Sequence, residues 1–276
     1  MAETTGFRLH VKNDVWYYTI SSFDDTGLVK NGFSTRKGGV SSGQYSTLNL
    51  GIKKSDSREA IRENFSRFCS AVGIDPGNMV FSDQVHGARV ALVDGHDRGK
   101  GFLRDTDIFA TDGLMTCQAG VALVTFYADC VPLFFLDPVY PAIALSHAGW
   151  RGTVAKIGAK TLAMMQETFG TRPEDCLVGI GPSIGPCCFE VDPPVMEEFA
   201  AAFPQNRGII SPGRKPGKYN IDLWEANRAE LIGMGVPEKN VTLASICTCC
   251  NTDIFFSHRG DKGRTGSMAA ILMLKE

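Results

Sequence analysis

Short, almost entirely apolar runs dominate the middle of the chain. Val121–Tyr127 and Ala142–Leu145 are rich in aliphatic and aromatic residues and are bounded by Gly, Pro or Asp. Runs with such boundaries are typical of buried β-strands. Residues 120–169 are therefore predicted to form three strands followed by a helix, with Asp137-Pro138 and Pro141 separating the second strand from the third.

Two stretches carry apolar residues at helical spacing. The first extends from about Asp56 to Val72, with a start at Asp56 and Glu59 that resembles a capping box and a stop at Gly73. The second extends from about Gly152 to Thr168. Both are predicted to be amphipathic helices that cover a sheet.

The remaining pattern continues the alternation of strands and helices without a clear linker. The other expected strands are Asp14–Ile20, Gly27–Ser34, Met79–His86, Arg89–Val93, Cys176–Ile180, Val241–Ile246, Asp253–Ser257 and Ser267–Leu274, and the other expected helices lie near Pro193–Phe203 and Asp222–Met234. This mixed order predicts an α/β fold of layered mixed β-sheets flanked by helices. We expect residues 1–276 to form a single domain.

Composition and charge exclude several classes of protein. Hydrophobic residues make up 43% and charged residues 21%, with a net charge of −2, so no basic surface for nucleic acid is expected. The start MetAlaGluThrThrGly lacks the basic and apolar regions of a signal peptide. The longest uncharged run, Gly113–Ala128, is too short for a membrane helix. We predict a cytoplasmic protein without nucleic-acid or membrane partners.

Three residues with metal-binding side chains lie at the ends of predicted strands. Cys130 follows the first central run, His147 follows Ala142–Leu145, and His86 ends the segment SerAspGlnValHis. Two imidazoles and a thiolate suit a tetrahedral zinc ion with one position open for water or substrate. The same residues could instead form a Cys/His nucleophilic pair, or be three unrelated buried residues.

The nine cysteines are odd in number, in a long chain without a visible export signal, so a disulfide framework is not expected. Cys69 and Cys117 are predicted to be small buried hydrophobic residues. Cys247-Thr-Cys249-Cys250 resembles half of a zinc site that only Cys187-Cys188 could complete, but incidental cysteines are the favoured interpretation.

Several arginines follow the same segments and could bind an anionic substrate. Arg36 lies in a Gly-rich turn, Arg151 follows the Gly149 turn, and Arg259 and Arg264 lie near the C-terminus. A guanidinium binds phosphate through two parallel hydrogen bonds, which would suit a phosphate co-substrate. A solvated surface position is the alternative for each of them, and His258 is a further candidate for the same cleft.

The chain resembles the bacterial YfiH/YlmD-type laccase-domain family, whose members are also described as multicopper polyphenol oxidoreductases and as purine nucleoside phosphorylases. The resemblance covers roughly residues 28–274. The matching segments are SerThrArgLysGlyGlyValSer (34–41), AspGlnValHisGly (83–87), ThrAspGlyLeuMetThr (111–116), AlaAspCysValPro (128–132), SerHisAlaGlyTrpArgGly (146–152), GlyIleGlyProSerIleGlyProCysCysPheGluVal (179–191) and PhePheSerHisArg (255–259).

This resemblance implies a fold distantly similar to cysteine hydrolases and a zinc ion, with copper as the alternative, bound by His86, Cys130 and His147. It also implies phosphorolysis of adenosine, inosine and methylthioadenosine, with some deamination of adenosine. The expected partners are therefore a purine nucleoside and phosphate, and the expected oligomeric state is a monomer or a weak homodimer. Family members have also been linked to copper-dependent phenol oxidation and to cell-wall peptide synthesis.

The leading hypothesis is a zinc-dependent purine nucleoside phosphorylase with accompanying adenosine deaminase activity. Cys130 and Asp129 are the expected catalytic residues, and Arg36 and Arg151 are expected to bind substrate or phosphate. One alternative is a copper-dependent polyphenol oxidase (laccase), although five histidines are few for several copper centres. Another is a hydrolase that uses Cys130 and His147 on a peptidoglycan precursor.

Overall fold

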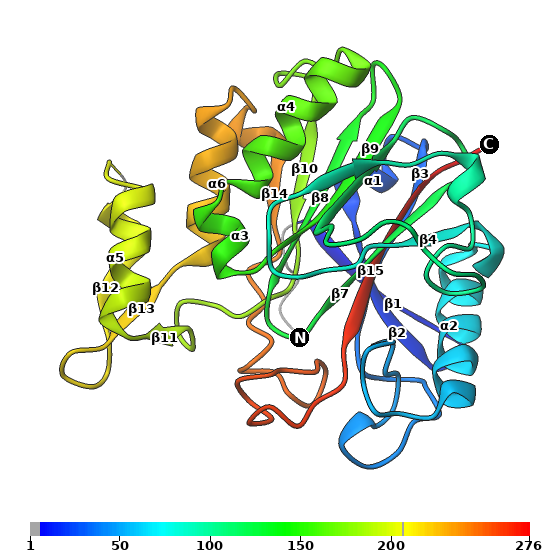
Figure 1. The fold of residues 1–276 in the computed structure, drawn as a ribbon, viewed down its shortest axis with the longest axis horizontal. Coiled ribbons are helices and arrows are strands. Elements are labelled where there is room, and N and C mark those ends of the chain that lie inside the picture. Colours follow the sequence, from blue (N-terminus) through cyan, green and yellow to red (C-terminus); the bar gives the residue numbers. More distant parts are fainter. Residues whose placement is uncertain (1–5, 206) are drawn as a thin grey trace.

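Two six-stranded sheets packed face to face form the centre of the computed structural model, which describes residues 6–205 and 207–276 (Figure 1). The chain start, on which the prediction of no export signal rests, lies mostly outside the described residues. The α/β prediction of layered mixed sheets flanked by helices is confirmed. No helix of the described ranges combines the length and apolar character needed to cross a membrane.

The first sheet has the strand order β1-β2-β3-β15-β7-β4. Its strands are β1 (Phe7–Lys12), β2 (Val15–Ile20), β3 (Val29–Ser34), β15 (Met268–Leu274), β7 (Ala122–Tyr127) and β4 (Met79–Phe81). Strands from both ends of the chain thus meet at its centre, where β15 pairs with β3 and β7.

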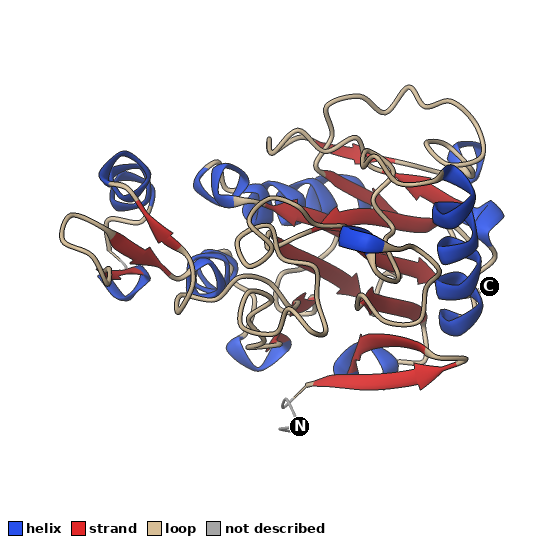
Figure 2. Ribbon diagram, turned by 90° about the horizontal axis from the view of Figure 1, so that it is seen from below, coloured by secondary structure: helices blue, strands red, loops and turns tan. Residues whose placement is uncertain are grey.

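The second sheet has the order β14-β10-β8-β9-β6-β5. Its strands are β14 (Val241–Leu243), β10 (Leu177–Ile180), β8 (Val131–Asp137), β9 (Ala142–Ala148), β6 (Gly113–Thr116) and β5 (Val90–Leu92). A separate small sheet of β11 (Glu190–Val191), β13 (Tyr219–Ile221) and β12 (Ile210–Pro212) projects at one end of the molecule with α5 (Figure 2).

Helices cover the outer faces of both large sheets (Figure 1). The helices are α1 (Ser21–Asp24), α2 (Arg58–Val72), α3 (Trp150–Val154), α4 (Ile157–Phe169), α5 (Pro193–Ala202) and α6 (Leu223–Gly233). Phe65 and Phe68 of α2 pack on the first sheet, and Leu162 of α4 and Leu231 of α6 belong to the core beside the second.

Successive side chains of the central strands point to opposite faces of their sheet. One face packs in the core between the two sheets, and the other packs against the helices. Leu123 and Tyr127 of β7 point into the core between the sheets, whereas Val124 points toward α2. Phe134 of β8 likewise faces the core between the sheets, and Phe135 faces the helices over the second sheet. Strands buried on both faces must be apolar throughout, which explains the uninterrupted runs in the sequence.

The predicted helix over residues 152–168 is in fact two helices, α3 and α4. Lys156, between them, has a left-handed φ of 63°. Its ammonium lies 3.0 Å from the ring centroid of Phe203, and α3 packs against the end of β9. These tertiary contacts interrupt a helical pattern that the sequence carries without a break.

The first predicted helix begins two residues later than expected. Ser57, not Asp56, caps α2 by accepting a hydrogen bond from the Ala60 amide at 3.2 Å. The Asp56 carboxylate instead accepts hydrogen bonds from Ser41 and Asn49. The stop at Gly73 is confirmed, since this residue adopts a left-handed φ of 82°.

Two predicted strands are mostly loops. Residues 253–257 are not a strand but begin with a turn, in which the amides of Ile254 and Phe255 both donate to the Asn251 carbonyl, and continue as irregular backbone. Strand β4 ends at Phe81 because the Gln84 side chain then bonds both backbone groups of Phe126. Strands β1, β6, β11, β12 and β13 were not predicted.

The two cysteines that were expected in the core have different surroundings. Cys69 is fully buried, as predicted. Cys117 is exposed, and the prediction for it was wrong.

A carboxylate buried between α4 and α6 makes the stability of the fold depend on pH. Glu230 accepts a hydrogen bond from the Ala159 amide at 2.6 Å, and its other oxygen has no partner among the described residues. Burial raises the pKa of Glu230 from 4.5 to about 7. The folded state therefore binds a proton more tightly than the unfolded state, so stability falls as pH rises from about 4.5 to 7.

Replacing Glu230 by glutamine is expected to remove this pH dependence while keeping the acceptor for Ala159. The variant and the original chain should unfold alike below about pH 4, where Glu230 is largely protonated in both the folded and the unfolded state. Above pH 8 the variant should be more stable by up to roughly 3 kcal/mol. Denaturant unfolding at the two pH values measures the difference, and an equal stability of the two chains at high pH would contradict the prediction.

Candidate functional site

The register of two neighbouring strands brings Cys130 beside His147. Strands β8 and β9 are antiparallel, and Pro132 pairs with His147. Cys130 lies two residues before Pro132, at the turn that connects the first sheet to the second, and His147 lies near the end of β9. The strands expected to end at these residues, β7 and β9, lie in different sheets, and the two residues meet because the start of β8 pairs with the end of β9.

His86 completes the group from the loop between β4 and β5. One donor atom from each of His86, Cys130 and His147 lies within 4.8 Å of the other two. The two imidazole rings meet edge to face, with centroids 4.9 Å apart. A Cβ atom on Gly149 would lie 3.0 Å from the His86 ring and 3.2 Å from the Cys130 sulfur, so the turn after β9 leaves little room for a side chain.

Asp112, for which the sequence predicts no role, positions both histidines. Its carboxylate lies 2.9 Å from Nδ1 of His147 and accepts hydrogen bonds from the amides of Val85, His86 and Gly87. Those bonds support His86 in a left-handed conformation with a φ of 62°. A carboxylate on Nδ1 leaves Nε2 as the ligand atom, which is the usual arrangement around a metal-binding histidine.

The buried charges of this group support one another. Burial by itself would raise the pKa of the Cys130 thiol, but His147 and His86 outweigh it and lower that pKa to about 6. Burial would likewise lower the pKa of His147, but Cys130 and Asp112 outweigh it and raise that pKa to about 9. The arrangement therefore favours a thiolate, which is the form of cysteine that binds metals and acts as a nucleophile.

A cavity of about 450 Å³ opens beside the three donor residues. Its polar wall includes Lys54, Arg151, His258 and Arg259. Its apolar wall consists of aromatic and aliphatic side chains: Ile52, Phe126, Tyr127, Trp150, Ile184, Phe189 and Leu223. This size and this mixture of apolar and polar side chains are typical of a binding site for a small molecule.

The two arginines predicted to bind substrate have different positions. Arg151 lines the cavity, with its guanidinium 4.2 Å from the ring centroid of Trp150. Arg36 is not among the residues that line it. The Arg36 side chain instead donates to the carbonyls of Ser46 and Thr252 and lies over Phe256, so the structure gives it a role in holding loops.

Asp129 lines the cavity, but both of its carboxylate oxygens are engaged. One accepts a hydrogen bond from the Thr248 hydroxyl at 2.7 Å, and the other accepts one from the Arg259 amide at 2.7 Å. Asp129 therefore ties the turn before β8 to the C-terminal segment 248–259. Its φ of 92° is unusual for a residue other than glycine.

The donor set fits a metal ion of the kind that the resemblance implies. Two imidazoles and one thiolate are within reach of one another, and Asp112 orients one imidazole from behind. Three protein ligands next to a cavity leave a coordination position for a ligand from the cavity, as in catalytic zinc sites.

Comparisons with known proteins cover most of the chain and agree with the fold. A family model described as multi-copper polyphenol oxidoreductase laccase matches residues 30–275. The protein named purine nucleoside phosphorylase YlmD from Geobacillus stearothermophilus is 38% identical over 247 residues, which is 89% of this chain and 90% of that protein. Its counterpart of the same name from Bacillus subtilis is 37% identical over 246 residues, 89% of this chain and 88% of that protein.

Solved structures of similar proteins have the same fold. The structure of YlmD from Geobacillus stearothermophilus superposes with a TM-score of 0.91 at 34% identity, covering 98% of this chain and 99% of that one. The Bacillus licheniformis hypothetical protein YfiH superposes with a TM-score of 0.90 at 35% identity, with 98% and 99% of the chains covered. The chain therefore belongs to the multicopper polyphenol oxidoreductase laccase family, several members of which are named purine nucleoside phosphorylase.

Proposed function

We propose that this chain is a zinc-dependent purine nucleoside phosphorylase that cleaves adenosine, inosine and methylthioadenosine, and that the same cavity deaminates adenosine. One observation carries the proposal: the donor set His86, Cys130 and His147 and the cations of Lys54 and Arg151 line the same cavity of about 450 Å³. The printed names of the relatives support the choice of substrate class.

Zinc suits the donor set, because two imidazoles and a thiolate are common ligands of this ion. When bound, zinc supplies a positive charge at its open position, which lowers the pKa of an oxygen ligand and stabilises negative charge on a substrate. Copper-dependent phenol oxidation is a weaker hypothesis. Only three of the five histidines, His86, His147 and His258, line the cavity, and several copper centres would need more.

In phosphorolysis the glycosidic C–N bond breaks and a bond forms between C1′ of the pentose and a phosphate oxygen. The base leaves with the bonding electrons and takes up a proton. Arg151 and Lys54 would bind the phosphate dianion, while the aromatic wall around Phe126 and Trp150 packs against the purine. Binding both reactants side by side replaces an encounter in solution with a reaction inside one complex.

Positive charge develops on the pentose as the C–N bond breaks. Asp129 is the one carboxylate among the described residues that line the cavity, so we assign it the stabilisation of that charge. Interactions of this kind are worth about 10²–10³ in rate. Its bonds to Thr248 and Arg259 hold the carboxylate in place, which also makes it a structural residue.

The proposal is tested by incubating the zinc-loaded protein with inosine, with and without phosphate. Hypoxanthine separated by chromatography should appear only when phosphate is present. Adenosine under the same conditions should yield adenine with phosphate and inosine without it. Release of hypoxanthine at the same rate without phosphate would show hydrolysis and refute the proposal.

A second candidate function rests on the same residues. Cys130, His147 and Asp112 have the order of a nucleophile, a base and an orienting carboxylate, as in thiol hydrolases. In that case the thiolate would be free to attack a carbonyl, whereas in the zinc enzyme it would be occupied by the metal.

Alkylation by iodoacetamide distinguishes these two functions. We expect Cys130 in the zinc-loaded protein to react at least about tenfold more slowly than in the chelator-treated protein, since a metal-bound thiolate is shielded. Peptide mass spectrometry measures the labelling, and the exposed Cys117 serves as an internal control whose rate should not change. Equal labelling of Cys130 in both samples would favour the hydrolase.

A further inference from the structure

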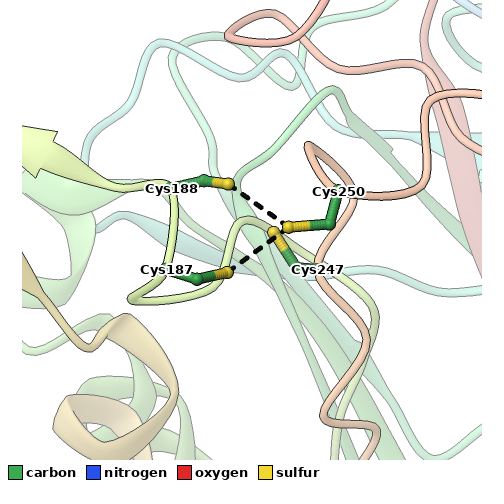
Figure 3. Close-up of side chains that lie close together, drawn as sticks. All are labelled: Cys187, Cys188, Cys247 and Cys250. Atoms are coloured by element: carbon green, nitrogen blue, oxygen red, sulfur yellow. Dashed lines mark hydrogen bonds between the residues drawn. The ribbon is translucent and has the colours of Figure 1, made fainter.

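Four cysteines outside the cavity triad converge at one point. Cys187 and Cys188 lie in the loop between β10 and β11, and Cys247 and Cys250 follow β14. Their four sulfur atoms all lie within 4.8 Å of one another (Figure 3). Nothing in the sequence shows that these two distant loops meet, so incidental cysteines are the interpretation that the sequence favours.

Backbone contacts hold the two cysteine pairs together. Ser183 and Cys247 form a parallel β-bridge, and the amide of Thr248 donates to the Ser183 carbonyl at 3.0 Å. The amide of Gly185 donates to the sulfur of Cys247 at 3.2 Å, which ties this sulfur to the loop that carries Cys187 and Cys188. Since backbone pairing brings the loops together, the convergence of the sulfurs does not depend on the cysteine rotamers alone.

The sulfur spacing suits a tetrahedral metal ion better than a disulfide. The Cys250 sulfur lies 3.5 Å from that of Cys187 and 3.4 Å from that of Cys188. Four thiolates at about 2.3 Å from zinc are separated from one another by about 3.8 Å, whereas a disulfide bond measures about 2.05 Å. All four cysteines are free thiols in this structure.

The surroundings can balance the negative charge of four thiolates around a divalent ion. The guanidinium of Arg214 donates to the Cys187 carbonyl at 3.3 Å, and that of Arg259 donates to the Cys188 carbonyl at 2.9 Å. Both arginines border a small hollow beside the cluster, together with Glu190. The Glu190 carboxylate is itself engaged, since it accepts a hydrogen bond from the Arg214 amide at 2.8 Å.

We propose that Cys187, Cys188, Cys247 and Cys250 bind one zinc ion in a second, structural metal site. Four protein ligands leave no position for a substrate, so the role of the ion is to hold two loops together. One loop leads into the small sheet and α5. The other carries Thr248, which bonds Asp129 in the cavity wall. Zinc at this site would therefore stabilise the cavity from outside.

Metal content tests the proposal directly. Elemental analysis of the original chain is expected to give about two zinc ions per chain, and the Cys130→Ala variant and the Cys187→Ser/Cys250→Ser double variant should each retain about one. Cys249→Ser is the matched control, since this residue lies between the proposed ligands but is not one of them, and it should retain both ions. The proposal is overturned if Cys130→Ala contains no zinc or if the double variant contains as much as the original chain.

A second measurement covers the case in which the double variant does not fold. Cobalt is titrated into the metal-free Cys130→Ala variant, in which all four cysteines of the cluster are intact. One equivalent should produce the strong thiolate-to-cobalt absorption of a tetrahedral all-sulfur site. Absence of these bands refutes the proposal, as does a mass two hydrogens lower per chain before reduction, which would show a disulfide in place of a metal.

Discussion

Replacing Cys130 by alanine is expected to reduce kcat/KM for the phosphorolysis of inosine by at least about 10³-fold. The substitution removes the one sulfur ligand of the cavity site and leaves two imidazoles, which bind zinc much more weakly. It also removes the negative charge that raises the pKa of His147. Initial rates of base release, measured with the metal content of the same samples, give the effect.

The control for this experiment is Cys117→Ala, because Cys117 is an exposed free thiol and does not line the cavity. It should keep the activity and the zinc content of the original chain. Activity of Cys130→Ala within tenfold of the original, in a sample that has lost the cavity zinc, would mean that the metal is not needed for phosphorolysis.

Replacing Asp112 by asparagine is expected to weaken zinc binding at the cavity site by about 10–100-fold, which is the usual cost of losing the carboxylate behind a metal-binding histidine. Asp112 is fully buried and bonds both Nδ1 of His147 and the amides of the 85–87 turn. An amide in its place keeps the volume but loses the charge that orients the imidazole. Competition with a chromophoric chelator measures the affinity.

Asp83→Asn provides the matched control for Asp112. The Asp83 carboxylate also accepts a backbone amide, that of Ala110, but it pairs with Lys53 and does not bond either histidine. Its replacement should leave zinc affinity within about threefold of the original, because no ligand is oriented through it. If both variants lose zinc affinity equally, the loss results from a less stable loop and not from a changed orientation of His147.

The central part of the fold could be predicted because burial there produces simple local patterns in the sequence. Strands β7, β8 and β9 are buried on both faces, so each appears as an unbroken apolar run. Helix α2 has one apolar face and ends at a glycine. These features are local, and local patterns are what a sequence reports best.

The failures have a common physical cause, which is that contacts between distant segments override local pattern. Phe255 and Phe256 are fully buried between the sheets, so they resemble a strand although their backbone is irregular. Lys156 leaves the helical conformation at a position that a continuous helix would tolerate. Strands β11, β12 and β13 have two or three residues each, which is too short for a period to appear.

The candidate site was partly predictable, because two of its residues follow local apolar runs. Cys130 and His147 follow apolar runs, and the neighbouring strands β8 and β9 bring them together. The sequence does not indicate that Asp112 belongs to the site, since its hydrogen-bond partners lie 25 to 35 residues away along the chain. The cysteine cluster joins residues more than 60 positions apart, and neither pair by itself distinguishes a ligand from an incidental cysteine.

The central claim is that His86, Cys130 and His147 bind one metal ion at the wall of the cavity. Crystals of the zinc-loaded protein, measured on both sides of the zinc absorption edge, test it most directly. We expect an anomalous peak at about 2.0–2.3 Å from the Cys130 sulfur and from one nitrogen of each histidine. Anomalous density at the four-cysteine cluster with none between these three residues would contradict the claim, and with it the proposed phosphorolysis.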